Sequence, residues 1–317
     1  MYADKTIAVV VPAYNEAHLI EKTLQSIPDF VDAIIVVDDA STDGTKNTVV
    51  LCKAKDSRIN LVTHETNLGV GAAIVTGYKK AMDLGMEVAA VMAGDGQMDP
   101  EDLTDIVVPV AEGAADYTKG NRLFHGHAWH LMPRHRYLGN SFLSLLTKIA
   151  SGYWHIADSQ SGFTAISLSA LQALDLDKVY RRYGMPNDFL IRLNEHGFRV
   201  KDVPIRPVYG VGETSGINLI EVVPRIVWIL WKGFWRRLFF KYVIQDFHPL
   251  IFFYLLGLVL FPGGLLSGLY LLYHRLFIGP VAVTSALFAV FLFISGLQSL
   301  FFAMWFDMEY NKDLKIR

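Results

Sequence analysis

Two long stretches without a charged side chain constrain this chain more than any other feature. Leu250–Tyr273 contains no Asp, Glu, Lys or Arg, and neither does Leu276–Phe306. About 20 apolar residues are enough to cross the hydrocarbon core of a bilayer, so each stretch is long enough to span one. A short turn with a single Arg joins them. The sequence therefore predicts a two-span transmembrane hairpin over residues 248–317, ending in a short tail.

The segment before the hairpin, residues 218–247, combines aromatic and basic side chains. Trp228, Trp231 and Trp235 recur three and four residues apart, among Ile and Leu and close to several Lys and Arg residues. This pattern predicts amphipathic helices lying in a membrane interface, with membrane lipids as partners. An amphipathic helix packed on a soluble domain is the alternative. Because this segment is much more basic than the turn, the positive-inside rule predicts a cytoplasmic domain and cytoplasmic termini.

Residues 1–217 alternate between two patterns, short apolar runs rich in β-branched residues and longer helix-like segments. The expected strands are Ile7–Val11, Ala33–Val37, Asn60–Thr63 and Val88–Met92, and the expected helices are Ala17–Ser26, Thr45–Ala54, Gly71–Leu84 and Glu101–Glu112. Such alternation predicts an α/β domain with a mostly parallel sheet and helices on both faces. Ligands of these sheets bind beyond the carboxyl ends of the strands, so the residues after each strand are the candidates for chemistry.

Charge and cysteine content exclude several classes of protein. The formal net charge of -2 provides no excess of positive charge, so nucleic acid is not an expected partner. Cys52 is the single cysteine, which rules out an intrachain disulfide and a site of four cysteine ligands. The N-terminus lacks the pattern of a secretory signal. A homo-oligomer is compatible with these observations.

Two motifs follow the first two expected strands: "VPAYNE" at Val11–Glu16 and "VVDDASTDGT" at Val36–Thr45. At this separation the pair resembles the family 2 glycosyltransferases, which have the Rossmann-like GT-A fold, and the resemblance extends over residues 6–245. It implies a hexosyltransferase in which Asp39 hydrogen-bonds the base of a nucleotide-sugar, as suits an acceptor-only carboxylate. The alternative is that Asp39, Ser41 and Asp43 only form a turn and cap the next helix. The other nucleotide-sugar-binding residues it implies are Pro12, Ala13, Tyr14, Glu16, Asp95 and the backbone at Gly71.

The fourth expected strand leads into Asp95 and Gln97, where the resemblance places the family's metal-binding motif. It implies that these two residues hold Mg²⁺ or Mn²⁺ on the diphosphate, where a cation with oxygen ligands neutralises the leaving group. Ala93 stands where the related lipid-phosphate transferases have a first Asp, which leaves completion of the metal shell open. A water or Asp99 could complete it, although Asp99 is better read as the N-cap of the next helix.

The next candidates are expected after a fifth strand: Arg122, Arg136 and Asn140. Their spacing resembles that of the dolichol-phosphate-mannose synthase branch. The resemblance implies that the two arginines contact the acceptor phosphate, with Asn140 nearby. Guanidinium groups match phosphate oxygens in geometry and stay charged. The acceptor implied is therefore a polyprenyl phosphate, either dolichyl or undecaprenyl.

Asp158 and Asp188 are the two remaining catalytic candidates. Asp158 opens the sequence "DSQSGF", a loop that the resemblance places at the acceptor side, where Asp158 orients the acceptor or the arginines. Asp188 occupies the position of a general base in other family 2 enzymes, and a helix cap is its alternative role. A hydroxyl acceptor needs such a base. A lipid monophosphate is largely ionised at neutral pH and does not.

The expected function is transfer of a hexose from a GDP- or UDP-hexose to polyprenyl phosphate at the cytoplasmic membrane face, with inversion and a divalent cation. Two alternatives remain at this stage. One is a glycosyltransferase that extends a glycolipid or glycan at a hydroxyl. The other is a non-catalytic nucleotide-sugar-binding membrane subunit, suggested by Ala93 and by Gly216, which stands where the family has a Lys.

Overall fold

The computed structural model describes residues 1–124, 134–206, 208 and 219–316, with no side-chain description for residues 134–136, 219 and 220. The chain divides into two compact units, one of Met1–Phe234 with Asp313–Arg317 and the other of Trp235–Lys312. The boundary thus differs from the expected division at residues 217 and 247. The residues expected to form a short tail belong instead to the first unit.

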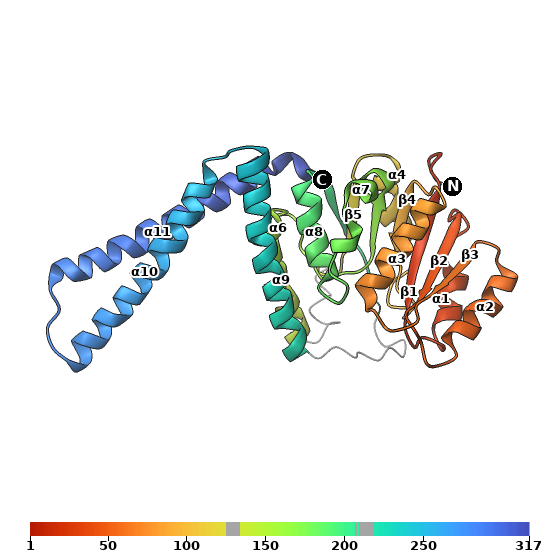
Figure 1. The fold of residues 1–317 in the computed structure, drawn as a ribbon, viewed down its shortest axis with the longest axis horizontal. Helices are drawn as coiled ribbons and strands as arrows, with labels where there is room; N and C mark the ends of the chain where they lie inside the picture. Colours follow the sequence, from red (N-terminus) through yellow and green to blue (C-terminus); the bar gives the residue numbers. More distant parts are fainter. Residues whose placement is uncertain (125–133, 207, 209–218, 317) are drawn as a thin grey trace. The chain divides into compact units, whose positions relative to one another are not determined.

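The first unit is built on a mixed sheet of eight described strands in the order β3-β2-β1-β4-β6-β5-β7-β8 (Figure 1). Its strands are β1 (Ile7–Ala13), β2 (Ala33–Asp38), β3 (Ile59–Thr63), β4 (Val88–Val91), β5 (Tyr117–Asn121), β6 (Thr164–Ser167), β7 (Val200–Pro204) and β8 (Lys315–Ile316). β6 is antiparallel to β4 and β5, whereas the other described pairs are parallel. β4 and β5 therefore run in the same direction and end at the same edge of the sheet.

Helices cover both faces of the sheet, as expected because its strands β1, β2, β4 and β5 are buried along their whole length. They are α1 (Ile20–Ser26), α2 (Thr45–Lys55), α3 (Val70–Asp83), α4 (Asp102–Ala111), α6 (Arg134–Ser151), α7 (Leu168–Ala173), α8 (Met185–Glu195) and α9 (Leu219–Phe239). Side chains along β1 alternate between two cores: Val9 packs with α1, α2 and α4, and Val10 packs with α3, α7 and α8. The predicted mostly parallel, doubly covered sheet is confirmed.

Helix α3 approaches β1 closely because it carries a glycine at the contact. A Cβ atom on Gly77 would lie 2.2 Å from Cγ1 of Val10, far inside van der Waals contact. Any larger side chain at this position would push the helix away from the sheet. The first turn of α3, which borders the strand ends, is held in place by this contact.

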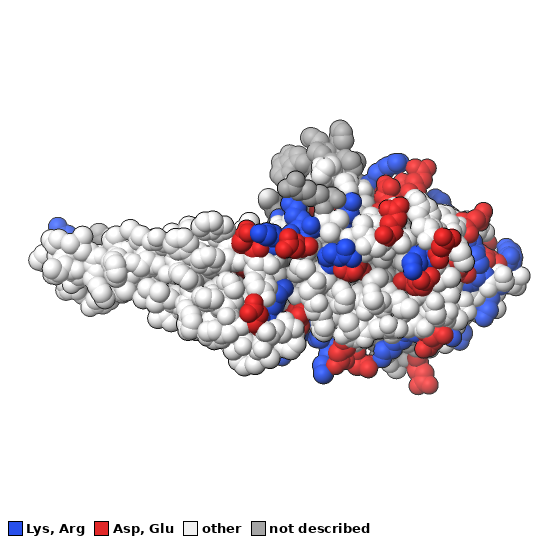
Figure 2. All heavy atoms as spheres, turned by 90° about the horizontal axis from the view of Figure 1, so that it is seen from above, with Lys and Arg blue, Asp and Glu red and all other residues white. Residues whose placement is uncertain are grey.

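The second unit is a helical hairpin of α10 (Leu250–Phe277) and α11 (Val283–Tyr310). Both helices are long and apolar enough to cross a membrane, with mean hydropathies of 2.2 and 2.1, and Figure 2 shows them almost free of charged side chains. A Cβ on Gly264 would lie 2.3 Å from the backbone N of Phe293, and one on Gly296 would lie 2.2 Å from that of Phe261. Small residues thus let the two backbones meet, as is common between transmembrane helices.

A buried polar network ties α11 to the segment before the hairpin. Arg237, at the end of α9, is fully buried and donates to both carboxylate oxygens of Asp307, at 2.8 and 3.1 Å. Lys241, in a π-helical turn (Phe240–Gln245), donates to Oδ1 of Asn311 at 2.7 Å. Breaking one partner of such a pair would leave an uncompensated buried charge, so the network fixes how the chain enters the hairpin.

Candidate active site

A cavity of about 550 Å³ opens at the carboxyl ends of β1, β2 and β4, the edge at which ligands were expected. It is lined by residues that follow these strands, by the start of α3 and by two residues ahead of α8. They are Pro12, Ala13, Tyr14, Asn15, Glu16, Asp39, Asn67, Gly69, Val70, Ala73, Ala93, Gly94, Asp95, Arg182 and Tyr183. Six of the seven predicted nucleotide-sugar-binding positions therefore share one cavity.

Gly71, the seventh, lies just outside it. A Cβ on Gly71 would come within 2.6 Å of the carbonyl oxygen of Tyr180, so this glycine serves the packing of α3 against the segment ahead of α8. The glycine that lines the cavity is Gly69, which has a φ of +97° and thus a backbone conformation that favours glycine.

Side chains of the second motif hold the first motif in place. The Asn15 N–H donates to Ser41 Oγ at 3.0 Å, and the Glu16 N–H donates to Thr45 Oγ1 at 2.8 Å. Asp43 in turn accepts from the Thr45 N–H at 2.9 Å. The local structural role considered for Ser41 and Asp43 therefore describes them well. These bonds explain why the two motifs occur together and why α1 begins at Ile20 rather than at Ala17.

Asp39 is almost completely buried at the base of the cavity. Its Oδ1 accepts hydrogen bonds from the Leu68 N–H at 2.9 Å and from Nδ1 of His64 at 2.7 Å, and its Oδ2 accepts one from the Gly69 N–H at 2.8 Å. His64 is itself held by Thr76 Oγ1, 3.0 Å from Nε2. Two carboxylate oxygens offer about four acceptor positions. The described donors occupy three of them and leave one, on Oδ2.

The sequence analysis did not single out His64. The available signal was its position immediately after β3, because the residues that follow parallel strands meet at one sheet edge. A histidine there is close to whatever follows the neighbouring strand, which is Asp39.

Asp95 and Glu16 face the same cavity from different loops. Partial burial, followed by the charges of Asp95 and Asp43, raises the pKa of Glu16 to about 7. Two carboxylates that repel each other in this way suit a cation between or beside them, and oxygen ligands are those preferred by Mg²⁺ and Mn²⁺. Among the described residues, no group of three or more His, Cys, Asp or Glu side chains is arranged as a metal site. A bound cation would therefore need diphosphate oxygens or water as further ligands.

Gln97 and Asp99 shape the turn after Asp95. The Gln97 N–H donates to Oδ1 of Asp95 at 3.0 Å, and Gln97 itself is not among the residues that line the cavity. Oδ1 of Asp99 accepts the Glu101 N–H at 3.0 Å in the turn before α4, whose N-cap is Glu101 rather than the expected Asp99. Ala93 lies in the cavity wall, so a carboxylate at this position would also have faced the ligand space.

Arg182 and Tyr183 complete the cavity and were missed by sequence reasoning. The side chain of Arg182 lies against Gly69, and the neighbouring carbonyl of Arg181 accepts the Ala72 N–H at 3.0 Å. These contacts fix an arginine in the wall of the cavity that Asp95 also lines. The sequence offered only two adjacent arginines ahead of a helix, which is too common a pattern to identify a site.

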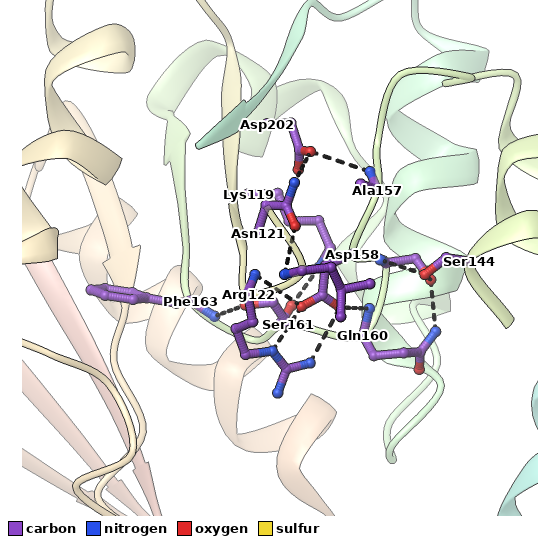
Figure 3. Close-up of polar contacts among 12 residues, drawn as sticks. Lys119, Asn121, Arg122, Ser144, Ala157, Asp158, Gln160, Ser161, Phe163 and Asp202 are labelled. Atoms are coloured by element: carbon purple, nitrogen blue, oxygen red, sulfur yellow. Dashed lines mark hydrogen bonds and ion pairs between the residues drawn. The ribbon is translucent and has the colours of Figure 1, made fainter. Parts of the chain in front are cut away.

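The second predicted site lies beyond β5 and in the loop before β6 (Figure 3). Arg122 donates from Nε to Oδ2 of Asp158 at 2.7 Å and from Nη2 to Oδ1 at 3.2 Å. The N–H of Gln160 also donates to Oδ1, at 3.1 Å. Burial alone would raise the pKa of Asp158, but Arg122 and Lys119 hold it below its ordinary value. Asp158 is therefore a fully buried anion that orients Arg122 and is unsuited to act as a base.

Two more charged residues, Lys119 and Asp202, form a cluster with Arg122 and Asp158. Lys119 is fully buried and donates from Nζ to the Ser161 carbonyl; burial lowers its pKa to about 8. Burial likewise raises the pKa of Asp202 to about 6, against hydrogen bonds from the Ala157 N–H and from Asn121. The cluster thus contains two cations and two carboxylates within one hydrogen-bonded group.

The remaining predicted site residues lie elsewhere. Asp188 is buried in the first turn of α8, where its Oδ2 accepts the Tyr180 N–H at 3.0 Å and Nε of Arg192 at 2.9 Å; it does not line the cavity. Asn140 is half-buried on α6, and Arg136 lies in the first turn of that helix with its side chain outside the described residues. Gly216 also lies outside the described residues.

Comparisons with known proteins define the class. Residues 8–175 match the model of Glycosyl transferase family 2, and the chain belongs to this family. It is accordingly a glycosyltransferase of the hexosyltransferase kind, as the sequence motifs indicated.

Three relatives show which branch of the family this chain resembles. A UDP-N-acetylglucosamine–dolichyl-phosphate N-acetylglucosaminyltransferase of Methanococcus voltae is 33% identical over 65% of this chain and 87% of its own length. An undecaprenyl-phosphate mannosyltransferase of Micrococcus luteus is 30% identical over 73% and 98%. A polyprenol monophosphomannose synthase of Mycolicibacterium smegmatis is 28% identical over 69% and 84%. The relatives are thus polyprenyl-phosphate sugar transferases.

The fold has solved counterparts. Glucosyl-3-phosphoglycerate synthase of Mycobacterium tuberculosis, in complex with Mn²⁺, UDP and glucosyl-3-phosphoglycerate, superposes with a TM-score of 0.54 at 21% identity, over 74% of this chain and 80% of the other. At this identity the likeness shows the fold alone. The expected GT-A fold is confirmed.

Proposed function

We propose that this protein transfers a hexose from a UDP-sugar to a polyprenyl phosphate at the cytoplasmic face of a membrane, with Mg²⁺ or Mn²⁺ and with inversion at the anomeric carbon. The observation that carries the proposal is the pairing of Arg122 with a buried, ionised Asp158 at the edge where β4 and β5 end together. It sets a fixed cation after β5, at the same sheet edge as Asp95, which follows β4. The similarity to polyprenyl-phosphate sugar transferases supports the same conclusion.

The surroundings of the two candidate bases favour a phosphate acceptor over a hydroxyl. Asp158 is held as an anion by Arg122, and Asp188 is engaged by Arg192 away from the cavity. A hydroxyl acceptor would need one of them to take its proton. A phosphate monoester is already largely ionised and needs charge compensation and orientation, which arginine supplies.

The environment of Asp39 supports uracil as the base. Guanine presents two adjacent N–H donors, and a carboxylate meets them by accepting on both oxygens. Uracil presents a single N–H at the equivalent edge. With three acceptor positions of Asp39 occupied by Leu68, Gly69 and His64, the remaining position on Oδ2 matches one donor.

The described residues divide the work of the reaction. Asp39 reads the base, Asp95 and Glu16 provide oxygen ligands near the diphosphate, and Arg182, which lines the same cavity, compensates the negative charge of the diphosphate. A bound divalent cation would supply Lewis-acid stabilisation of the leaving nucleoside diphosphate. Arg122 orients the acceptor phosphate, whose oxygen attacks the anomeric carbon from the face opposite the leaving group. Arg136 and Asn140 are proposed to assist at the acceptor.

A direct assay tests the proposal. Purified protein in detergent or nanodiscs is offered radiolabelled UDP-glucose, UDP-N-acetylglucosamine and GDP-mannose, with polyprenyl phosphate and Mn²⁺. We expect a chloroform-soluble labelled lipid with a UDP-sugar only, and loss of that product with EDTA. Label that appears only on a preformed glycan would contradict the acceptor, and a labelled lipid formed from GDP-mannose alone would contradict the donor.

A further inference from the structure

One wall of the cavity comes from a short connection that is neither helix nor strand. Residues 179–184, here called the Arg182 segment, connect the 3-10 turn Leu176–Lys178 to α8. Arg182 and Tyr183 line the cavity from this segment, and both are exposed. A long side chain on an exposed loop loses rotamer freedom when it binds an anion, which weakens binding. A fixed backbone limits that loss, so the contacts that hold the segment matter for Arg182.

Asp188 and Arg192 of α8 hold the start of the Arg182 segment. Asp188 is 4% exposed, and its Oδ2 accepts the Tyr180 N–H at 3.0 Å and Nε of Arg192 at 2.9 Å. Nη2 of Arg192 donates in turn to the Lys178 carbonyl. The ion pair on α8 therefore binds two backbone groups that precede Arg182 in the chain.

Two other helices hold the rest of the segment. The Ala72 N–H in the first turn of α3 donates to the Arg181 carbonyl at 3.0 Å. On α9, Ile229 packs against Gly184, where an added Cβ would lie 2.6 Å from its Cδ1. The backbone on either side of Arg182 is thus fixed by α3, α8 and α9 together.

These contacts differ from those of a general base and from those of a helix cap. A general base must come within hydrogen-bond reach of the proton that it removes, and Asp188 does not line the cavity. A cap accepts an N–H from the first turn of its own helix. Asp188 instead accepts an N–H eight residues earlier in the chain, and the N-cap of α8 is Gly184.

We propose that Asp188 and Arg192 are positioning residues, which hold the Arg182 segment so that the Arg182 guanidinium meets the diphosphate of the donor. Asp188 acts through the backbone of Tyr180, two positions ahead of Arg182, and takes no proton in the reaction. The contact between Arg182 and the diphosphate rests on the proposed function. A binding experiment that needs no turnover keeps the two separable.

A double-mutant cycle on nucleotide binding tests the positioning role. The full chain in detergent is titrated calorimetrically with Mn²⁺ and with UDP or GDP, whichever the wild type binds more tightly. Asp188→Asn should weaken binding about fivefold or more, and Arg182→Ala about tenfold. The double variant should bind within about twofold of Arg182→Ala alone, because the effect of Asp188 passes through Arg182.

Two further variants make the cycle specific. Asp177→Asn is the matched control, because Asp177 lies ahead of the same segment but pairs with Lys79 at an exposed site, and it should leave nucleotide affinity unchanged. Arg192→Lys keeps a cation beside Asp188 and loses the donor to the Lys178 carbonyl, so it tests the segment even if Asp188→Asn does not fold. Its loss of affinity should likewise disappear in the Arg182→Ala background.

Several results would overturn the proposal. Losses that add in the double variants would mean a general loosening of the cavity, and a wild type that binds neither nucleotide would leave Arg182 without its ligand. In steady-state kinetics, Asp188→Asn should raise the KM for the nucleotide-sugar about fivefold and keep kcat within about threefold. A fall in kcat of about 100-fold or more with unchanged nucleotide affinity would make Asp188 a base. If the wild type binds nucleotide but transfers no sugar, the proposed function fails, and the binding cycle still decides the positioning role.

Discussion

The guanidinium of Arg122 meets the carboxylate of Asp158 at two points, with Nε 2.7 Å from Oδ2 and Nη2 3.2 Å from Oδ1. The two residues are 36 positions apart in the chain: Arg122 follows β5, and Asp158 lies in the loop before the antiparallel strand β6. A two-point pair fixes both the position and the plane of the guanidinium. This arrangement makes Arg122 a rigid feature of the site.

Arg122→Lys should keep the positive charge of the side chain and lose the planar guanidinium that makes the two-point contact. We expect the KM for polyprenyl phosphate to rise about tenfold or more, since hydrogen bonds to charged groups contribute about 1.5–3 kcal/mol. The KM for the nucleotide-sugar should stay within twofold. Steady-state kinetics with each substrate varied in turn provide the measurement, and an equal rise in both constants would count against an acceptor role.

Asp158→Asn should destabilise the first unit strongly. Lys119 and Arg122 would lose their buried counter-charge, and breaking a buried pair costs about 3–5 kcal/mol. Asp116→Asn is the matched control, because Asp116 pairs with Arg199 at a partly exposed site, where such pairs contribute about 1 kcal/mol or less. Thermal unfolding in detergent would compare them, and similar shifts for the two variants would contradict the role assigned to Asp158.

Asp95→Asn should abolish transfer and weaken Mn²⁺ binding in the presence of UDP by at least tenfold, because an anionic ligand is lost. Asp99→Asn keeps a cap-forming oxygen and should retain both properties. Mn²⁺ binding followed by electron paramagnetic resonance provides a measurement separate from activity. Unchanged Mn²⁺ binding in Asp95→Asn would remove this residue from the metal site.

The strand positions, the doubly covered sheet and the two long apolar helices could be predicted because each depends on a local pattern of apolar residues. Five residues of the cavity wall were also predicted, since they belong to recognisable motifs at strand ends: Pro12, Ala13, Tyr14, Glu16 and Asp39. His64 and Arg182 could not be found in this way. Each acts through a contact made only after folding, His64 with the end of β2 and Arg182 with Gly69 at the start of α3.

His64→Ala should change base selectivity. The wild type is expected to bind UDP at least tenfold more tightly than GDP, because Asp39 has one acceptor position left. Without His64, Oδ1 regains an acceptor position, so the preference should shrink as UDP affinity falls and GDP affinity rises. Isothermal titration with both nucleotides measures the ratio. A wild-type protein that binds GDP more tightly than UDP would contradict the conclusion that Asp39 has a single acceptor position left for the base.

Asp202→Asn should stabilise the protein in a pH-dependent manner. The folded-state pKa of about 6 exceeds the ordinary value of 3.8, so the native state holds the proton more tightly. The stability that comes from this group is present below pH 4 and is lost as the pH rises through 6. Between pH 4 and pH 6 the free energy of unfolding of the variant should therefore rise relative to that of the wild type, by ~3 kcal/mol at most. Equal pH profiles of unfolding for the two proteins would contradict this.

Strand β8 pairs with β7, so the chain returns to the catalytic sheet after the hairpin. The hairpin is therefore an insertion within a domain rather than an appendage at its end. A stop codon ahead of residue 250 would remove not only the two long apolar helices but also the edge of the sheet beside Val200 and Lys201. A water-soluble version of the enzyme would best be obtained by replacing the hairpin with a short linker and retaining residues 313–316.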